Sequence, residues 1–317
     1  MLDKKNFYIN GKWVPPVEPK SYKVIDPSNE EPCAEISIGG KKDIDKAVSA
    51  AKNSFETWAF SKKEERLELF EKLYTIYKKR WAEMAKLISM EMGAPMKFAT
   101  ELQAATGASH IKSFKNILKD FRFEKDLGEE KNNQKLLYEP KGVCALITPW
   151  NWPINQVNLK VIPALASACT VVLKPSEIAP LSSMLLAEMI DEAKFPSGVF
   201  NLVNGDGELT GNALTSHPDI NMISFTGSTR AGALISQNAA KDFKRISLEL
   251  GGKGANIIFK DADSNAIARG VLRCFRNSGQ SCNAPTRMLV EKSIYKETVE
   301  KVIELANNTK VAAPNKD

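Results

Sequence analysis

The stretch VCALITPWNWPINQVNLKVIPALASACTVVLKPSE, residues 143–177, contains two short apolar runs. These runs, Val143–Thr148 and Thr170–Leu173, lie on either side of a stretch with helical spacing at about 154–167. Neither run alternates polar with apolar residues, which is typical of strands that are buried on both faces. A strand, a helix and a second strand in this order predict a parallel sheet with helices on its faces.

The same alternation continues towards the C-terminus and predicts an α/β fold. Three more apolar runs and three more helical stretches follow the second run, at 181–193, Val199–Val203, 207–216, Met222–Thr226, 229–240 and Ser247–Leu250. Beyond Gly252, two further units of strand and helix follow, at Asn256–Phe259 with 263–276, and at Arg287–Val290 with 293–309. At roughly 100–200 residues per domain, the 317 residues predict two domains, and we place the boundary at residue 250.

Upstream of the sheet the sequence predicts mainly helices. Asp43 is expected to cap the first helix, since apolar residues follow it at helical spacing. Ser61 and Glu64 have the spacing of a capping box, and we expect it to open one long helix that runs through Ile88. The polar segment at about 121–139 predicts a hairpin or arm on the surface.

Composition and charge exclude several classes of protein. Lys and Arg number 44 and Asp and Glu number 38, a net charge of +6, and the charges of both signs are interleaved. Because no focused basic surface results, we expect neither nucleic acid nor membrane as a partner. The N-terminus lacks the apolar core of a signal peptide, and polar residues and prolines interrupt the uncharged stretch Gly142–Leu159. We therefore expect a cytoplasmic protein.

The cysteines are scattered and only two histidines are present, His110 and His217. Neither a zinc site nor a disulfide framework is expected, so no metal is predicted. Cys282 lies in a small polar loop, where a thiol is accessible and can be activated below its usual pKa. For the other cysteines we expect inert packing, at Cys33, Cys144, Cys169 and Cys274.

Polar residues follow the predicted strands at their carboxyl ends, where open α/β sheets bind ligands. Lys174 and Glu177 could both bind ribose hydroxyls, or could form an ordinary surface pair. Gly227 and Gly232 open a helix directly after a strand, which favours a phosphate, although alone this signal is weak. Glu249 lies between two leucines, so desolvation is expected to raise its pKa and make it a usable base; a structural buried acid is the alternative.

Taken together and in order, these segments resemble the NAD(P)-dependent aldehyde dehydrogenase superfamily. The matching segments are Tyr8–Trp13, Thr148–Pro153, Leu173–Glu177, Phe225–Thr229, Leu248–Lys253 and Gly279–Cys282. The resemblance implies a variant Rossmann sheet as cofactor domain in residues 1–250 and the start of an α/β catalytic domain in 251–317. Family chains continue well past the position of Asp317, so we expect an incomplete catalytic domain and a chain that is by itself inactive or nearly so and poorly behaved in solution.

The resemblance also implies the roles of individual residues. Cys282 would attack the aldehyde, Asn151 and the Cys282 backbone N–H would hold the oxyanion, and Glu249 would activate water to release the acid from a thioester. The substrate would contact Asn151, Trp152, Gln156 and Leu159. The cofactor would contact Ile147, Thr148, Pro149, Trp150, Lys174, Ser176, Glu177, Gly205, Phe225, Gly227, Ser228, Gly232 and Leu250.

NAD is expected as the cofactor in preference to NADP, because the Glu177 carboxylate can accept from both ribose hydroxyls but would repel a 2′-phosphate. The expected partners are a small aldehyde and further copies of the chain in a dimer or tetramer. Two alternatives stay open. One is a CoA-acylating semialdehyde dehydrogenase, against which Glu249 argues, and the other is an inactive cofactor-binding fragment.

Overall fold

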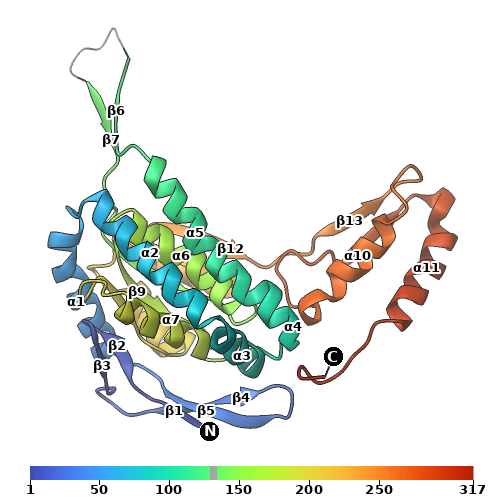
Figure 1. The fold of residues 1–317 in the computed structure, drawn as a ribbon, viewed down its shortest axis with the longest axis horizontal. Coiled ribbons are helices and arrows are strands. Elements are labelled where there is room, and N and C mark those ends of the chain that lie inside the picture. The colour runs from blue at the N-terminus through green and yellow to red at the C-terminus, as the bar shows by residue number, and fades with distance from the viewer. Residues whose placement is uncertain (129–133, 317) are drawn as a thin grey trace. The chain divides into compact units, whose positions relative to one another are not determined.

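The computed structural model describes residues 1–128 and 134–316, and Figure 1 draws its elements. The chain forms two compact units, Met1–Glu249 and Leu250–Asp317, which are described separately. The functional roles predicted for the two parts of the chain stay predictions.

The first unit is built on a seven-stranded sheet with the strand order β12-β11-β8-β9-β10-β2-β3. Its strands are β2 (Phe7–Ile9), β3 (Lys12–Val14), β8 (Val143–Ile147), β9 (Thr170–Lys174), β10 (Phe200–Leu202), β11 (Met222–Gly227) and β12 (Arg245–Leu250). β8 pairs parallel with β9 and β11, and β9 pairs parallel with β10. The predicted parallel sheet is confirmed for these four strands, and β2 and β3 extend it antiparallel at one edge.

Two layers of helices cover one face of this sheet and a single layer covers the other. α6 (Pro153–Ala166) packs on β8 and β9 beside α7 (Leu181–Glu192). Outside them pack α2 (Lys63–Lys79), α3 (Trp81–Met92) and α5 (Ala104–Asp120). The ribbons of α2, α5 and α6 run close together in Figure 1. α1 (Lys41–Trp58) packs on β8, β9 and β10 and contacts α8 (Asn212–Thr215), which in turn contacts α9 (Thr229–Ala240).

Helix starts and breaks differ from the sequence predictions by small amounts. α1 begins at Lys41. Asp43 is the third residue of the helix and accepts a hydrogen bond from the Gly40 N–H at 3.0 Å, so Asp43 is not itself the cap residue. The predicted capping box at Ser61 and Glu64 is wrong by one residue, because the Lys62 N–H donates to Glu65 at 3.2 Å.

The predicted long helix is two helices, α2 (Lys63–Lys79) and α3 (Trp81–Met92). They meet at Arg80, whose φ of −101° and ψ of 18° leave the helical region. The Arg80 guanidinium reaches Glu188 and Glu192 of α7, each at 2.6 Å, as well as Glu83. These charge-assisted bonds hold the break in place.

Two further predictions need correction. The run at Ser247–Leu250 is not buried on both faces, because β12 is an edge strand in which exposed and half-buried residues alternate. The helix predicted at 207–216 is a π-helical turn, η2 (Gly207–Gly211), followed by α8.

The remaining elements of the first unit form a small helical segment and two small sheets. α4 (Met96–Phe98), the π-helical turn η1 (Ala99–Gln103) and α5 (Ala104–Asp120) follow one another. β1 (Leu2–Lys4), β4 (Ser21–Asp26) and β5 (Glu31–Ser37) form one sheet. β6 (Glu124–Asp126) and β7 (Lys135–Leu137) pair antiparallel within the segment predicted as an arm, of which 129–133 lie outside the described residues.

The second unit contains a parallel pair, β13 (Ala255–Ile258) and β14 (Arg287–Val290), with α10 (Ala266–Phe275) and α11 (Tyr295–Asn307). The short 3₁₀ turns η3 (Arg276–Gly279) and η4 (Lys292–Ile294) complete it. Ile258 and Val271 are buried, whereas Ile257 and Leu289, which face each other across the pair, are exposed. Within the part of the chain that the structure describes, no helix combines the length and the apolar composition needed to span a membrane.

The start of α7 depends on a carboxylate from another helix. Pro180 precedes α7 and supplies no side-chain cap, and Glu91 of α3 accepts instead from the Leu181 N–H, the Ser182 N–H and the Ser182 hydroxyl. Glu91 is 1% exposed. Burial raises the pKa of Glu91 to about 7, and the hydrogen bonds from Ser182 and Leu181 oppose this rise.

Replacing Glu91 therefore tests how α7 is anchored. Glu91→Ala is expected to lower the free energy of unfolding by roughly 2–3 kcal/mol, because buried donors at the start of α7 lose their acceptor. Denaturant titration measures the loss. As a control, Glu83→Ala removes an exposed partner of Arg80 and should cost at most about 1 kcal/mol. Equal losses for the two variants would contradict the role assigned to Glu91.

Candidate functional site

Strand register places three of the predicted residues in one row. Ile147 at the end of β8 pairs with Lys174 of β9 on one side and with Phe225 of β11 on the other. The Thr148 N–H, one residue further on, donates to the Lys174 carbonyl at 3.2 Å. Since parallel strands present their carboxyl ends at the same edge, the loops after β8 and β9 begin at this row, and β11 continues two residues further, to Gly227.

Lys174 is the most constrained side chain of the row. It is 4% exposed, and its ammonium donates to the carbonyls of Pro175 at 3.0 Å and Gly205 at 2.6 Å, with Glu177 at 3.7 Å. Burial lowers its pKa, and Glu177 and Asp206 oppose this effect. Lys174, Glu177 and Gly205 therefore lie together, and the ammonium is held by backbone carbonyls.

A cavity of about 380 Å³ lies beside this row. Ile147, Lys174 and Phe225 line it, together with residues that the sequence analysis missed, namely Gly207, Glu208, Gly211, Asn212, Thr215, Arg230, Ala231, Leu234, Ile235 and Asn238. These come from η2, α8 and α9. Their only signal in the sequence is that their helices follow strands at the carboxyl edge, which does not single out individual residues.

The glycines near the cavity are required by local packing as much as by any ligand. A Cβ on Gly205 would lie 1.8 Å from Thr210 Oγ1, and one on Gly227 would lie 2.4 Å from the Phe225 ring. The Ser228 hydroxyl accepts the Ala231 N–H at 3.2 Å and caps α9, in which Gly232 is buried. Close approach of a phosphate is therefore not the only reason for glycine at these positions.

Asn151 lies in the loop that joins β8 to α6. Thr148–Trp152 form this loop, and Trp152 directly precedes the first residue of α6. Trp152, Gln156 and Leu159 follow at spacings of four and three, so they share one side of α6. Leu159 is 40% exposed, and Trp152 and Gln156 are half-buried. This side of α6 is therefore partly exposed to solvent.

The remaining predicted contacts differ in exposure. Ser176 is buried, and its hydroxyl accepts the Ile178 N–H at 3.3 Å. Thr148 is buried as well, whereas Pro149 and Trp150 are half-buried. None of these four lines the cavity beside the row. Leu250, the last residue of β12, is assigned to the second unit.

Glu249 is exposed on the edge strand β12, so the desolvation expected from its two leucine neighbours is not found. Lys160, a buried lysine of α6, interacts electrostatically with Glu249. Lys160 is 8% exposed, and its ammonium donates to the Ser224 hydroxyl of β11 at 3.0 Å. Burial lowers the pKa of Lys160 to about 8, and the Glu249 carboxylate opposes this effect.

Cys282 lies in the second unit, in the loop between η3 and β14, and is exposed as predicted. The three residues Asn277, Ser278 and Gly279 have φ values of 56°, 55° and 71°. Consecutive left-handed residues of which two are not glycine are strained, and such strain concentrates at functional sites. The Asn277 amide donates to the Gln280 carbonyl at 3.1 Å and holds this turn.

Among the buried cysteines, Cys169 departs from the expectation of a featureless packed thiol. A hydrogen bond from Cys144 lowers the pKa of Cys169 to about 6. Hydrogen bonds from Ser167 and from backbone N–H groups lower this pKa as well, whereas burial opposes the shift. The Lys141 N–H donates to its sulfur at 3.2 Å. Cys169 is 4% exposed, so this thiol has little access to solvent.

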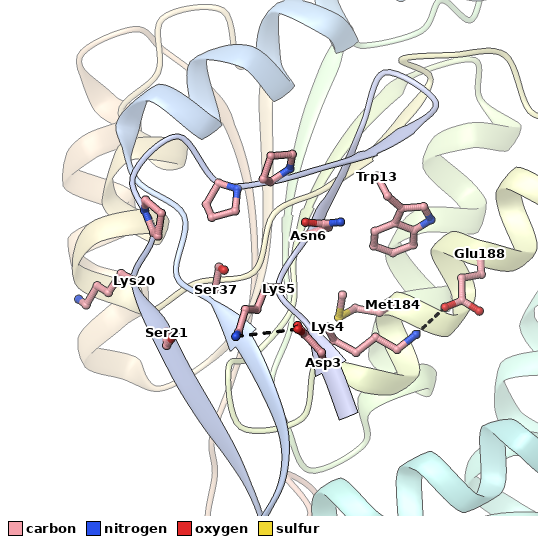
Figure 2. Close-up of a pocket in the computed structure, with 13 residues that line it drawn as sticks. Asp3, Lys4, Lys5, Asn6, Trp13, Lys20, Ser21, Ser37, Met184 and Glu188 are labelled. Atoms are coloured by element: carbon pink, nitrogen blue, oxygen red, sulfur yellow. Dashed lines mark hydrogen bonds and ion pairs between the residues drawn. The ribbon is translucent and has the colours of Figure 1, made fainter. Parts of the chain in front are cut away.

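A larger concave region of about 730 Å³ lies beside the N-terminal strands (Figure 2). Trp13 and Met184 provide apolar surface, and Lys4, Lys5 and Lys20 are each in an ion pair with a carboxylate. Because these charges are balanced, the region has no marked attraction for an anion. Residues 1–128 and 134–316 contain no group of three His, Cys, Asp or Glu side chains placed to hold a metal ion.

The chain is similar in sequence to known proteins. A family model described as "Aldehyde dehydrogenase family" matches residues 13–317. A curated relative, 3-succinoylsemialdehyde-pyridine dehydrogenase from Pseudomonas sp, is 50% identical over 295 residues, which are 92% of this chain and 61% of that protein.

Two solved structures are also similar. The crystal structure of an aldehyde dehydrogenase from Bartonella henselae is 58% identical, has a TM-score of 0.98, and is matched over 100% of this chain and 66% of that one. An alanine variant of aldehyde dehydrogenase C from Pseudomonas syringae, in complex with NAD+ and octanal, is 44% identical with a TM-score of 0.95 over 98% of this chain and 63% of that one. The chain thus spans less than two thirds of these relatives' lengths.

Replacing Lys160 tests its burial through the pH dependence of stability. Its pKa is about 8 in the folded chain, against the ordinary lysine value of 10.5 in the unfolded chain. Between these pH values the unfolded chain binds more protons, so the free energy of unfolding rises with pH. Lys160→Met should remove this contribution. Denaturant titration from pH 8 to about 10 measures it, with exposed Lys97→Met as control. An unchanged slope in Lys160→Met would contradict the assignment.

Proposed function

Since the chain belongs to the aldehyde dehydrogenase family, we propose that it carries the cofactor-binding unit and the nucleophile of an enzyme that oxidises an aldehyde to a carboxylic acid with NAD. The observation that carries this proposal is the level row of Ile147, Lys174 and Phe225 beside the cavity of about 380 Å³. A row of this kind at the carboxyl edge of a parallel sheet is where dinucleotides bind.

The residues around the cavity fit the chemistry of NAD. Apolar side chains of α9, among them Leu234 and Ile235, suit the flat adenine ring. Lys174 and Glu177 offer a donor and an acceptor for ribose hydroxyls, and Glu177 disfavours a 2′-phosphate. The relative from Pseudomonas syringae was solved with NAD+, which supports this choice. When bound, NAD supplies the acceptor for the hydride.

The chain's own residues would perform the remaining steps. The Cys282 thiolate attacks the aldehyde carbonyl carbon, and the oxyanion that forms accepts from the Asn151 amide and the Cys282 backbone N–H. One such donor is worth roughly 2.7–4 kcal/mol in the transition state. After hydride loss, Glu249 takes a proton from a water molecule that attacks the thioester carbonyl, and Cys282 leaves as the thiolate. The exposure of Glu249 on β12 keeps its carboxylate in contact with water.

The side of α6 that carries Trp152, Gln156 and Leu159 points to an aldehyde with an apolar body. Trp152 and Leu159 provide apolar surface, and Gln156 adds one amide that can bind a polar substituent. The names of two relatives support a substrate with an apolar body. One relative was solved with octanal, and the name of the other includes a pyridine semialdehyde. An aromatic or medium-chain aldehyde is therefore the proposed substrate class.

Substitution of Cys282 tests the proposed function. Cys282→Ala should lower aldehyde-dependent formation of NADH by at least roughly 10³-fold, because the nucleophile is lost. The absorbance of NADH measures the rate with a panel of aromatic and medium-chain aldehydes. The half-buried Cys274 provides the matched control, and Cys274→Ala should keep most of the activity. Wild-type turnover in Cys282→Ala would refute the proposal.

A further inference from the structure

The loop that carries Asn151 receives a hydrogen bond from a buried amide on another element. Gln103 Nε2 donates to the Asn151 backbone carbonyl at 3.3 Å and to Met92 Sδ, also at 3.3 Å. Gln103 is 0% exposed. Because Thr148–Trp152 contain no regular secondary structure, their conformation depends on contacts of this kind.

Gln103 is itself held in place by an unusual turn. It is the last residue of the π-helical turn η1, in which the Ala104 N–H bonds to the Ala99 carbonyl. Side chains of α2 and α3 bond to backbone carbonyls in and next to this turn. The Tyr77 hydroxyl donates to the Ala104 carbonyl at 2.8 Å, and the Trp81 Nε1–H donates to the Thr100 carbonyl at 3.1 Å. A π-helical turn shifts the direction of the side chains that follow, and such turns recur at functional sites.

The same side of α5 is bonded to α6 beyond the loop. The Asn158 amide donates to the Gly107 carbonyl at 2.9 Å, and His110 Nε2 lies 2.7 Å from Asn155 Oδ1. Gly107 and His110 are three residues apart on α5, so both face α6, and Gln103 lies one turn before them, at the end of η1. We call these three cross-links the α5–α6 seam. Its first link bonds to the loop, and the other two bond to α6 itself.

A second contact reaches the residue next to Asn151. The Phe98 ring packs edge-on against the Trp152 ring, with centroids 5.6 Å apart and an angle of 60°. Phe98 directly precedes η1. Two consecutive residues of the loop are therefore held by the segment 98–103, one through its carbonyl and one through its ring.

We propose that Gln103 is a positioning residue that fixes the Asn151 carbonyl and thereby orients the Asn151 side-chain amide for the oxyanion. The inference rests on the proposed role of Asn151. When the Asn151 carbonyl is held, its side-chain amide can adopt fewer orientations. The amide then needs little reorientation when negative charge develops on the substrate oxygen. Gln103 touches neither substrate nor cofactor in this scheme.

The test removes the donor while keeping the volume. Gln103→Leu is expected to lower kcat about tenfold with KM for NAD within twofold of wild type, since the cavity at β8, β9 and β11 is not altered. Hydrogen exchange of the amides of Trp150, Asn151 and Trp152 should become about tenfold faster. Gln103→Met retains the length of the side chain but loses both N–H donors, so it should show the same two changes.

His110→Leu is the matched control, because it breaks a link of the α5–α6 seam that does not touch the loop. It should leave kcat and loop exchange within about twofold of wild type. Unchanged loop exchange in both Gln103 variants, or an equal change in His110→Leu, would overturn the inference. The exchange measurement does not depend on turnover, so it decides whether Gln103 holds the loop even if the chain alone oxidises no aldehyde.

Discussion

The parallel register of β8 with β9 and β11 is the constraint on which the candidate site depends. It brings Ile147, Lys174 and Phe225 level, although they are far apart in the sequence. The loops after β8 and β9 then start from the same row, and the loop after β11 starts two residues beyond it. A shift of one residue in any of the three strands would turn its side chains to the opposite face and separate these residues.

Buried polar groups keep the surroundings of this row in place. The Lys174 ammonium joins β9 to the loop after β10 through the Gly205 carbonyl, and Glu91 anchors the start of α7. Gln103 does the same for the loop after β8. Each group is nearly inaccessible to solvent, where an unsatisfied donor or acceptor is costly, so each link favours one arrangement strongly.

The sequence predicted the strands of the parallel sheet and their carboxyl ends because continuous apolar runs mark strands that are buried on both faces, and polar residues mark their ends. It could not predict features set by partners distant in the chain. The break at Arg80 depends on Glu188 and Glu192. The exposure of Glu249 accompanies the edge position of β12, in which polar Arg245, Ser247 and Glu249 alternate with apolar residues, a pattern that the shorter run 247–250 does not show in full. Gln103 carries no motif, and its role is visible only from its bond to Asn151.

A crystal structure of the chain with NAD bound tests the central claim most directly. The account predicts adenosine density in the cavity of about 380 Å³ between α8 and α9, with the ribose hydroxyls in hydrogen-bond distance of Glu177 and Lys174. Density in the concave region beside Trp13 and Met184 instead, or no density at saturating NAD, would contradict it.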